Sequence, residues 1–384
     1  MARPLRFALV AGEASGDLLG AALMEALREL RPDCQFVGVA GPRMAAAGCR
    51  PLARAEELAV MGLAEILRHL PRLLRLRRDV MSALLADPPD VFVGIDAPEF
   101  NLRLAARLKQ AGIPVVQYVS PQVWAWRQGR VRHIAAAVDR VLCLLPFETP
   151  FYAAHAVRAE FVGHPLADQI PLEVDKAAAR RALGLPESGQ VVALLPGSRL
   201  GEVSRLGADF AATAALLAAQ RGASAPTFIA PMATPAVQQV FAAQVAAAGA
   251  PVRLLEGQAR QALIAADVVL VTSGTATLET LLCKRPMVVA YRVAPLTAWI
   301  VRGLGLVKVP YCSQPNLLAN EPLVPEFLQE QVTPPTLAAA VAAQLDDPAL
   351  RLRLQERFLA MHRQLRQDGA RAAARAVLDC LPAP

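Results

Sequence analysis

Short apolar runs alternate with helical patterns along the first half of the chain. Residues 5–12, LRFALVAG, form a short apolar run that ends at a glycine, which is typical of a buried parallel strand. Residues 18–30 then repeat apolar side chains at helical spacing. Further strand-like runs, each separated by a helical stretch, are CQFVGVAG, DVFVGID, PVVQYVS and RVLCLLP. This alternation predicts a parallel sheet with helices on both faces.

The same alternation begins again after a linker-like stretch near residues 164–190. The strand-like runs that follow are VVALLPGSR, APTFIAPM, PVRLLEG, ADVVLVTSG and RPMVVAYRV. The sequence therefore predicts an α/β protein with two doubly wound, Rossmann-like domains, residues 1–165 and 166–350, and a helical tail, residues 351–384. Because ligands bind at the carboxyl ends of the strands in such sheets, we expect the site in a cleft between the domains, on loops that follow strands.

Composition narrows the class of protein. Hydrophobic residues make up 54% and charged residues 19% of 384 residues, which excludes a disordered chain. The net charge of +7 arises from the first half and the tail, and it suits anionic lipid or a phosphorylated substrate. No zinc-finger spacing or aromatic RNA-binding pattern accompanies it, so we expect no nucleic acid. No apolar run approaches the roughly 20 residues of a membrane span, so membrane contact should be peripheral.

The loop AGEASGD, residues 11–17, is the first candidate site. Gly12 and Gly16 let the backbone approach a ligand closely, and the helix that follows offers N–H groups to an anion. A simple helix cap at Ser15 explains part of this pattern equally well. Glu13 has no capping use and therefore points more strongly to a ligand.

Two further loops of the first half carry polar or aromatic residues. Asp96 ends the strongest strand pattern, where a carboxylate can accept a proton from a sugar hydroxyl; a helix cap is the alternative. Glu99 can share that role or complement the helix dipole, whereas a lone His164 is more often structural. Trp124 and Trp126 are unusual in a chain with so few aromatic residues, and they suit either a sugar or acyl groove or ordinary packing.

The second half has three candidate loops. A strand followed by Gly-Ser-Arg and a helix predicts an anion site formed by turn N–H groups, a hydroxyl and a fixed cation, with a simple turn as the alternative. The run VTSGTATLE offers small hydroxyl residues for a diphosphate and a carboxylate for ribose hydroxyls, with an N-capped core helix as the alternative. The run SQPNLLANEPLVPEFLQE adds amides. The candidate nucleotide-sugar contacts are Ser198, Arg199, Ser273, Gly274, Thr275, Glu279, Asn316 and Gln329.

Neither a metal nor a cofactor is expected. The histidines and cysteines lack ligand spacing, and no Asp-x-Asp pair stands where a metal would hold a diphosphate. If a nucleotide sugar is used, Arg199 and helix N-termini must neutralise its leaving group.

The order of these motifs resembles the lipid-A-disaccharide synthase family over about residues 5–335. The motifs that carry the resemblance are AGEASGD, GVAGPRM, MGLAEIL, PDVFVGIDAPEFN, YVSPQVWAWR, LPFE, FVGHPL, LLPGSR, TSGTATLE and PNLLANEPLVPEFLQ. Two departures are mild: SQPNLLANEP differs from the commoner form, and Glu99 stands where Asp is frequent.

The resemblance implies a GT-B glycosyltransferase, which has two Rossmann-like domains and often a C-terminal helix that crosses back to the first. The family transfers 2,3-diacylglucosamine from UDP to 2,3-diacylglucosamine 1-phosphate (lipid X) with inversion, giving a β-1,6-linked disaccharide and UDP. Asp96 matches the family's essential aspartate, and Arg199 its essential arginine. Glu13, Ser15 and Gly16 then belong to the loop opposite the leaving group.

Because the substrates that the resemblance implies are acylated, residues 61–81 are a candidate segment for membrane or acyl contact. The resemblance also implies a cytoplasmic location, on the inner membrane. Pro71 should end one helix of this segment and start the next. Apolar and basic residues on different faces of this segment predict contact with anionic lipid. A helix that packs its apolar face on the core and exposes its basic face to solvent would have the same pattern. A homodimer is possible, because the basic tail could pack on the first domain of a second copy. The candidate membrane or acyl contacts are Leu63, Ile66, Leu67, Leu70, Arg72 and Arg75.

Two other functions remain open at this point. A related GT-B enzyme, such as a UDP-GlcNAc 2-epimerase or a peptidoglycan glucosaminyltransferase, would share the fold, but an epimerase needs further carboxylates and histidines at the sugar. A non-catalytic nucleotide- or lipid-binding protein would also share it. The presence of both Asp96 and Arg199 argues against the second.

Overall fold

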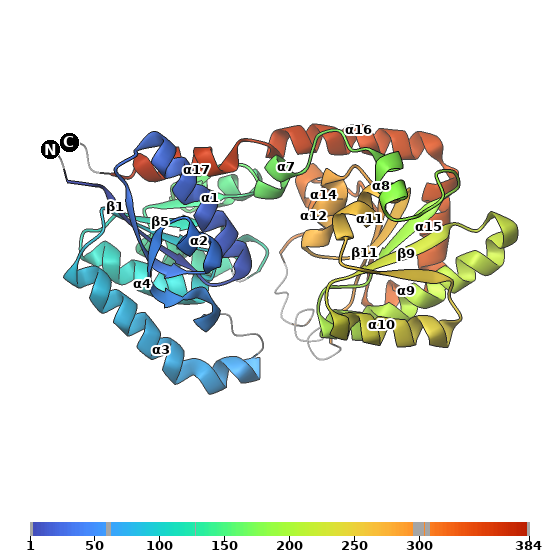
Figure 1. The fold of residues 1–384 in the computed structure, drawn as a ribbon, viewed down its shortest axis with the longest axis horizontal. Helices are drawn as coiled ribbons and strands as arrows, with labels where there is room; N and C mark the ends of the chain where they lie inside the picture. Colours follow the sequence, from blue (N-terminus) through green and yellow to red (C-terminus); the bar gives the residue numbers. More distant parts are fainter. Residues whose placement is uncertain (1–2, 59–62, 127, 295–302, 304–307, 382–384) are drawn as a thin grey trace. The chain divides into compact units, whose positions relative to one another are not determined.

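The computed structural model describes residues 3–58, 63–126, 128–294, 303 and 308–381. Contacts divide the chain into two compact units (Figure 1). The first holds residues 1–168 and 365–384, and the second residues 169–364. The expected tail therefore splits: residues 351–364 lie in the second unit, and only the last helix returns to the first.

A seven-stranded parallel sheet forms the centre of the first unit, in the order β3-β2-β1-β4-β5-β6-β7. Alternate residues of its strands enter different cores, because successive side chains point to opposite faces. Phe7 and Leu9 lie in one core and Ala8 and Val10 in the other. The strands are β1 Arg6–Ala11, β2 Gln35–Ala40, β3 Cys49–Arg54, β4 Val91–Ile95, β5 Val115–Tyr118, β6 Arg140–Cys143 and β7 Ala159–Phe161.

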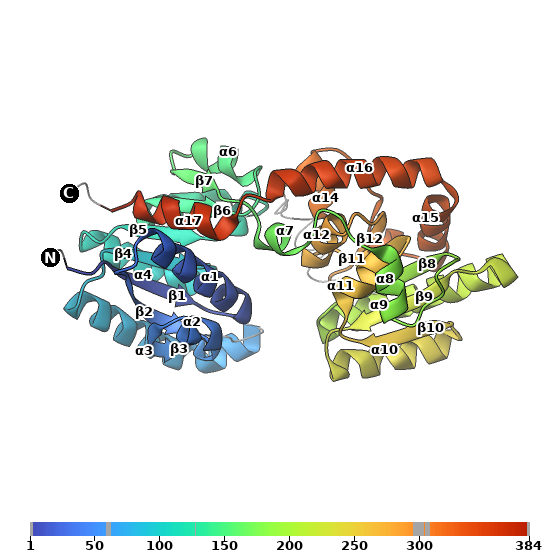
Figure 2. The same ribbon diagram turned by 45° about the horizontal axis from the view of Figure 1, so that its top comes forward.

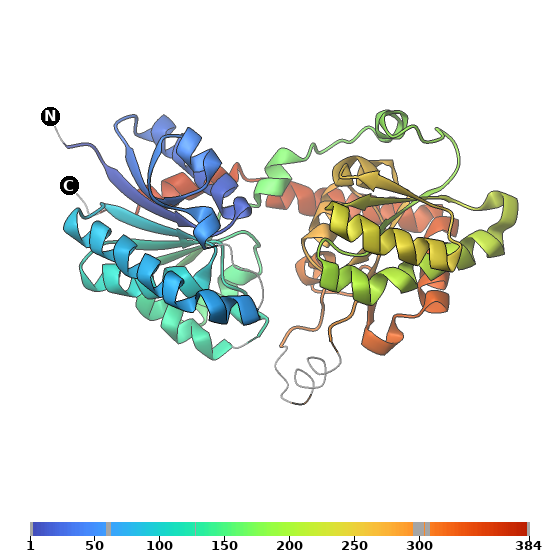
Figure 3. The same cartoon turned by 60° about the horizontal axis from the view of Figure 1, so that its bottom comes forward.

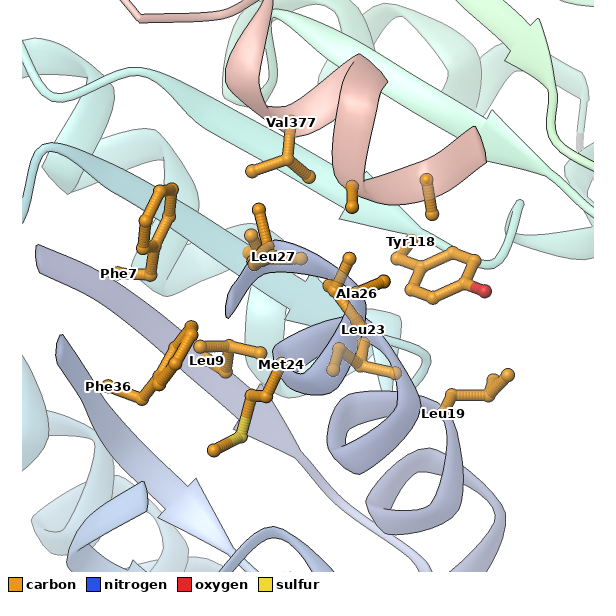
Figure 4. Packing of buried hydrophobic residues seen from close by; sticks show 14 of the residues in the cluster. Phe7, Leu9, Leu19, Leu23, Met24, Ala26, Leu27, Phe36, Tyr118 and Val377 are labelled. Carbon is orange, nitrogen blue, oxygen red and sulfur yellow. The ribbon is translucent and has the colours of Figure 1, made fainter. Parts of the chain in front are cut away.

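Helices cover both faces of this sheet. The C-terminal helix α17 lies beside α1, and Val377 packs into the same core as Leu27 and Phe7 (Figures 2 and 4). Helices α3, α4 and α5 supply the other core. The helices are α1 Ala14–Leu30, α2 Pro42–Ala46, α3 Leu63–Ala86, α4 Pro98–Gln110, α5 Val131–Ala137, α6 Glu148–Ala153, α7 Pro165–Gln169 and α17 Gly369–Leu378.

The second unit repeats this plan around a six-stranded parallel sheet, in the order β10-β9-β8-β11-β12-β13. Helices α9, α10 and α15 share one core with it, and Figure 3 shows α9 and α10 along that face. The strands are β8 Val191–Leu195, β9 Thr227–Met232, β10 Val252–Glu256, β11 Val268–Thr272, β12 Met287–Tyr291 and β13 Glu326–Leu328. The helices are α8 Lys176–Ala182, α9 Leu200–Arg221, α10 Pro235–Ala248, α11 Ala259–Ala265, α12 Thr275–Leu282, α14 Gln314–Ala319, α15 Pro334–Asp346 and α16 Pro348–Leu365.

The predicted parallel sheets are confirmed, with three additional strands. The additional strands are β3, β7 and β13, which lie at sheet edges and keep many side chains partly exposed, so they lack the continuous apolar run that predicts a strand. The expected break at Pro71 is wrong, because α3 continues through it. Among the described residues, no helix combines the length and apolar character needed to cross a bilayer.

Candidate active site

Two candidate loops of the first unit leave the sheet side by side. Strand β1 pairs with β4, with Ala11 opposite Ile95, and the strand order reverses between these two strands. Ligands bind at this point in doubly wound sheets. The loops are in contact, because a Cβ added to Gly12 would lie 2.7 Å from the Cβ of Ala97. Glu13, Ser15, Gly16 and Asp96 therefore share one edge of the sheet.

The first loop presents polar side chains that no helix cap uses. Glu13 occupies the N-cap position of α1, but no side chain caps that helix. Glu13 and Ser15 are exposed, whereas Gly16 is buried against Ala11. Asp17, which could have capped α1, instead accepts hydrogen bonds from the backbone N–H groups at the start of α2. The capping interpretation of this loop is therefore wrong, and Glu13 and Ser15 remain available to a ligand.

Asp96 follows β4 in an unusual backbone conformation. Its φ is 51° and that of Ala97 is 42°, so two consecutive non-glycine residues are left-handed. Burial raises the pKa of the Asp96 carboxyl, and a hydrogen bond from the Ala97 backbone offsets part of this effect. A desolvated carboxylate is a stronger base than an exposed one once it is ionised. The structure thus gives Asp96 the properties that a general base requires.

The other polar candidates of this half have structural partners. Glu99 forms a 2.7 Å ion pair with Arg130, which ties the start of α4 to the start of α5. Burial lowers the pKa of His164 to about 4, and its Nδ1 accepts a hydrogen bond from the N–H of Leu166 in α7. These contacts give both residues a structural use within the first unit.

The two tryptophans have different environments. Trp124 is 8% exposed, stacks edge-on against Phe147 at 4.9 Å, and donates from Nε1 to Glu148 Oε1 at 3.0 Å. Trp126 is 41% exposed. Glu148 is 4% exposed and also accepts from the N–H of Leu145, and burial raises its pKa to about 7. Glu148 was not among the predicted site residues, although a glutamate shortly after an apolar strand is a usable signal.

In the second unit, the two principal loops again follow neighbouring strands at the reversal of strand order. Strand β8 pairs with β11, and β8 leads to Ser198 and Arg199 at the start of α9. The Arg199 side chain is 70% exposed and lies 4.0 Å from Glu202 Oε1. Glu202 Oε2 accepts from the N–H groups of both loop residues, at 3.0 and 3.3 Å. Glu202, which was not among the predicted site residues, therefore shapes this loop.

Hydrogen bonds join the loop after β11 to the candidate loop SQPNLLANEP, since the N–H of Gln314 donates to Thr277 Oγ1 at 3.2 Å. Ser273 Oγ donates to the carbonyl of Cys312 at 2.6 Å. Gly274 is exposed with a φ of 144°, and exposed Thr275 starts α12. Burial raises the pKa of Glu279, and Arg260 opposes this rise. These residues combine exposed backbone donors with a half-buried carboxylate, as a diphosphate and a ribose require.

The expected direct contact from Asn316 is not supported. The residue is 1% exposed, and its amide donates to Val324 O at 2.9 Å and Glu326 Oε1 at 2.8 Å while accepting from the Val324 N–H at 2.8 Å. Glu326 also accepts from the N–H groups of Cys312 and Ser313. Asn316 therefore supports the loop. Gln329 follows β13 with a left-handed φ of 51° and is partly exposed.

Helix α3 presents exposed leucines and arginines together. Leu70 and Leu74 are 42% and 37% exposed. Arg72 is exposed and pairs with Glu57 at 3.3 Å, and Arg75 is exposed as well. The side chains of Leu63, Ile66 and Leu67 lie outside the described residues.

Comparisons with known proteins agree on the family and the fold. A family model for lipid-A-disaccharide synthetase matches residues 7–377. The lipid-A-disaccharide synthase of Pseudomonas aeruginosa (strain UCBPP-PA14) is 53% identical over 380 residues, covering 99% of both chains.

Two solved structures have similar folds. The glycotransferase of kitacinnamycin is 20% identical with a TM-score of 0.62, covering 99% of this chain and 100% of that one. The UDP-GlcNAc 2-epimerase from Neisseria meningitidis, bound to UDP-GlcNAc, is 11% identical with a TM-score of 0.63, covering 98% and 100%. The predicted class, two doubly wound α/β domains of the GT-B type, is confirmed.

Proposed function

Because the chain belongs to the lipid-A-disaccharide synthetase family, we propose that it transfers 2,3-diacylglucosamine from UDP to 2,3-diacylglucosamine 1-phosphate. The products are the β-1,6-linked disaccharide 1-phosphate and UDP. The observation that carries the proposal is the position of Asp96: a half-buried carboxylate at the reversal of strand order, in a loop that contacts the first loop.

Asp96 acts as the general base of a single displacement. Its carboxylate takes the proton from the acceptor's 6-hydroxyl while that oxygen attacks the anomeric carbon, and the bond from this carbon to the UDP oxygen breaks. The configuration at the anomeric carbon inverts because one displacement occurs. The raised pKa of Asp96 supports this role, since a base is most effective when its pKa approaches the working pH. Glu13 and Ser15 contact the acceptor from the first loop.

The second unit binds the UDP group. Arg199 and the N–H groups that follow β8 and β11 stabilise the charge that develops on the leaving diphosphate. The exposure of Arg199 supports this assignment, because a cation that must reach a ligand cannot be buried in a structural ion pair. Ser198, Ser273, Gly274 and Thr275 line this contact, Glu279 accepts from ribose hydroxyls, and Gln329 supplies an amide.

We also propose that the enzyme lies peripherally on the cytoplasmic face of the inner membrane, because the acyl chains of both proposed substrates would keep them in a bilayer. Exposed Leu70 and Leu74 next to exposed Arg72 and Arg75 on α3 support contact with anionic lipid.

The deciding experiment is a radiolabel transfer assay in detergent, with UDP-2,3-diacylglucosamine as donor, with and without lipid X, in the presence of EDTA. We expect a disaccharide phosphate only when lipid X is present, and EDTA should not prevent its formation. The epimerase fold neighbour supplies the alternative. Turnover of UDP-GlcNAc without any lipid acceptor, and no disaccharide, would favour that activity instead.

A further inference from the structure

Two buried amides hold the backbone carbonyl of Asp96. Asn101 Nδ2 lies 2.9 Å from this oxygen and Gln117 Nε2 lies 3.1 Å from it. Asn101 is on α4, one turn after the loop, and Gln117 is on β5, the neighbouring strand. The carbonyl of the proposed base thus receives donors from two different elements of the fold.

These side chains are polar residues in an otherwise apolar region. Asn101 is 0% exposed and Gln117 is 1% exposed. The Asn101 amide also lies 3.3 Å from Val10 O and 3.4 Å from Ile95 O, at the ends of β1 and β4. The Gln117 amide lies 3.3 Å from Val119 O. Burying an amide N–H group is unfavourable unless it has an acceptor, and here the acceptors are carbonyls at the carboxyl edge of the sheet.

The backbone that they hold is strained. Asp96 and Ala97 are both left-handed, and so is Val119, a β-branched residue with a φ of 74°. Such conformations persist only where the surroundings fix them, and they concentrate at active sites. The carbonyls that these turns direct away from the strand ladder need donors, because unpaired buried carbonyls are costly. Asn101 and Gln117 provide those donors.

The sequence leaves room for both amides. Gly94 lies opposite Gln117 in the pairing of β4 with β5. A Cβ at Gly94 would come within 3.0 Å of both Asn101 Cβ and Gln117 Oε1. A Cβ at Gly12 would come closer still, 2.7 Å from the Cβ of Ala97. Gly12, Gly94, the two amides and the strained turn therefore pack closely around Asp96.

We propose that Asn101 and Gln117 are positioning residues, which fix the left-handed turn from which the Asp96 carboxylate extends. This inference rests on the proposed role of Asp96 as the base. Asn101 and Gln117 act through the backbone of Asp96, so their loss should lower the rate of the chemical step and leave binding of the UDP group unchanged.

The test compares Gln117→Met with a matched variant elsewhere in the molecule. Gln344 on α15 is also buried, 3% exposed, and its Nε2 donates to a single backbone carbonyl, that of Met287, at 2.9 Å. Gln344→Met therefore removes a buried amide of the same kind from the second unit. We expect Gln117→Met to lower kcat by about tenfold to a hundredfold, with the KM for the donor and the Kd for UDP within about twofold. Gln344→Met should lower the melting temperature and leave kcat unchanged.

A second variant keeps the test valid if Gln117→Met does not fold. Asn101→Ser retains a donor hydroxyl on a smaller side chain, and we expect an intermediate loss of kcat. An unchanged kcat in the folded variants, or an equal loss of kcat in Gln344→Met, would overturn the proposal.

Combination with Asp96→Asn separates positioning from general damage. If Gln117 acts through the base, Gln117→Met should cause no further loss of rate in the Asp96→Asn background. A full additional loss there would refute the positioning role. Full activity of Asp96→Asn alone would instead refute the assignment of the base, so the two failures are distinguishable.

Discussion

The two candidate half-sites, around Asp96 and around Arg199, occupy the same place in two similar sheets but are built differently. Asp96 is half-buried in a strained turn whose carbonyl is held by buried amides. The Arg199 side chain is 70% exposed, and Glu202 accepts hydrogen bonds from the backbone N–H groups of Ser198 and Arg199. In both loops neighbouring side chains hold the backbone, but the Asp96 side chain is half-buried whereas the Arg199 side chain is exposed.

This difference corresponds to the two proposed tasks. Proton transfer depends on geometry within a fraction of an ångström and on a desolvated carboxylate, so its residue benefits from rigid support. Binding of a diphosphate depends on a cation and N–H donors that meet the ligand, so an exposed arginine is suitable. The half-buried Asp96 therefore suits proton transfer, and the exposed Arg199 suits binding of a diphosphate.

The largest expected effect is the loss of the base. Asp96→Asn keeps the size of the side chain but cannot accept the proton, so kcat should fall by about 10³ to 10⁴. The Kd for UDP, measured by calorimetry, should not change, because the proposed UDP contacts lie in the second unit. Retention of full transferase activity would show that another group is the base.

A smaller effect is expected at the exposed half-site. Arg199→Ala should lower kcat/KM by about 10² to 10³, since it removes a cation from the leaving group, and it should also weaken UDP binding. Arg181→Ala is the control, because Arg181 is another exposed arginine of the same unit, 58% exposed and paired with Glu187. Equal effects of the two substitutions would contradict the diphosphate assignment.

The burial of Glu148 in the first unit predicts that the stability of the protein depends on pH. The pKa of Glu148 is about 7 in the folded protein and lower when unfolded, so the unfolded state loses this proton first as pH rises. The stability that it contributes is present at low pH and lost as pH rises through about 7. Between pH 5 and 8, the free energy of unfolding of the wild type, measured in urea, should therefore fall by up to about 3 kcal/mol relative to that of Glu148→Gln. A constant difference across this range would contradict the burial argument.

The smallest effect concerns the exposed face of α3. Arg72→Glu and Arg75→Glu should each weaken binding to phosphatidylserine vesicles by about tenfold, as expected for a basic residue near an anionic surface. Arg181→Glu, on the second unit, should leave co-sedimentation unchanged. Unchanged binding of both α3 variants would remove the membrane assignment of this helix.

Much of this architecture could be predicted from the sequence, because strongly apolar strands followed by glycine-rich turns are local patterns. Asp96 and Arg199 were recognisable because each follows such a strand. Edge strands β3, β7 and β13 were not, since partly exposed strands have no distinct apolar pattern. Asn316 was misread because an amide in a loop gives no local sign of whether a ligand or the protein satisfies it.

The sequence by itself determined the class of fold, the family and the loops that carry candidate chemistry. Only the tertiary structure decided that β1 lies beside β4 and that β8 lies beside β11. In each sheet, this pairing brings loops that are far apart in sequence to the same edge. It also decided that Asn101, Gln117 and Glu148 are buried supports. The physical reason is that burial and hydrogen-bond partners are properties of packing between distant segments, whereas hydrophobic periodicity is written locally along the chain.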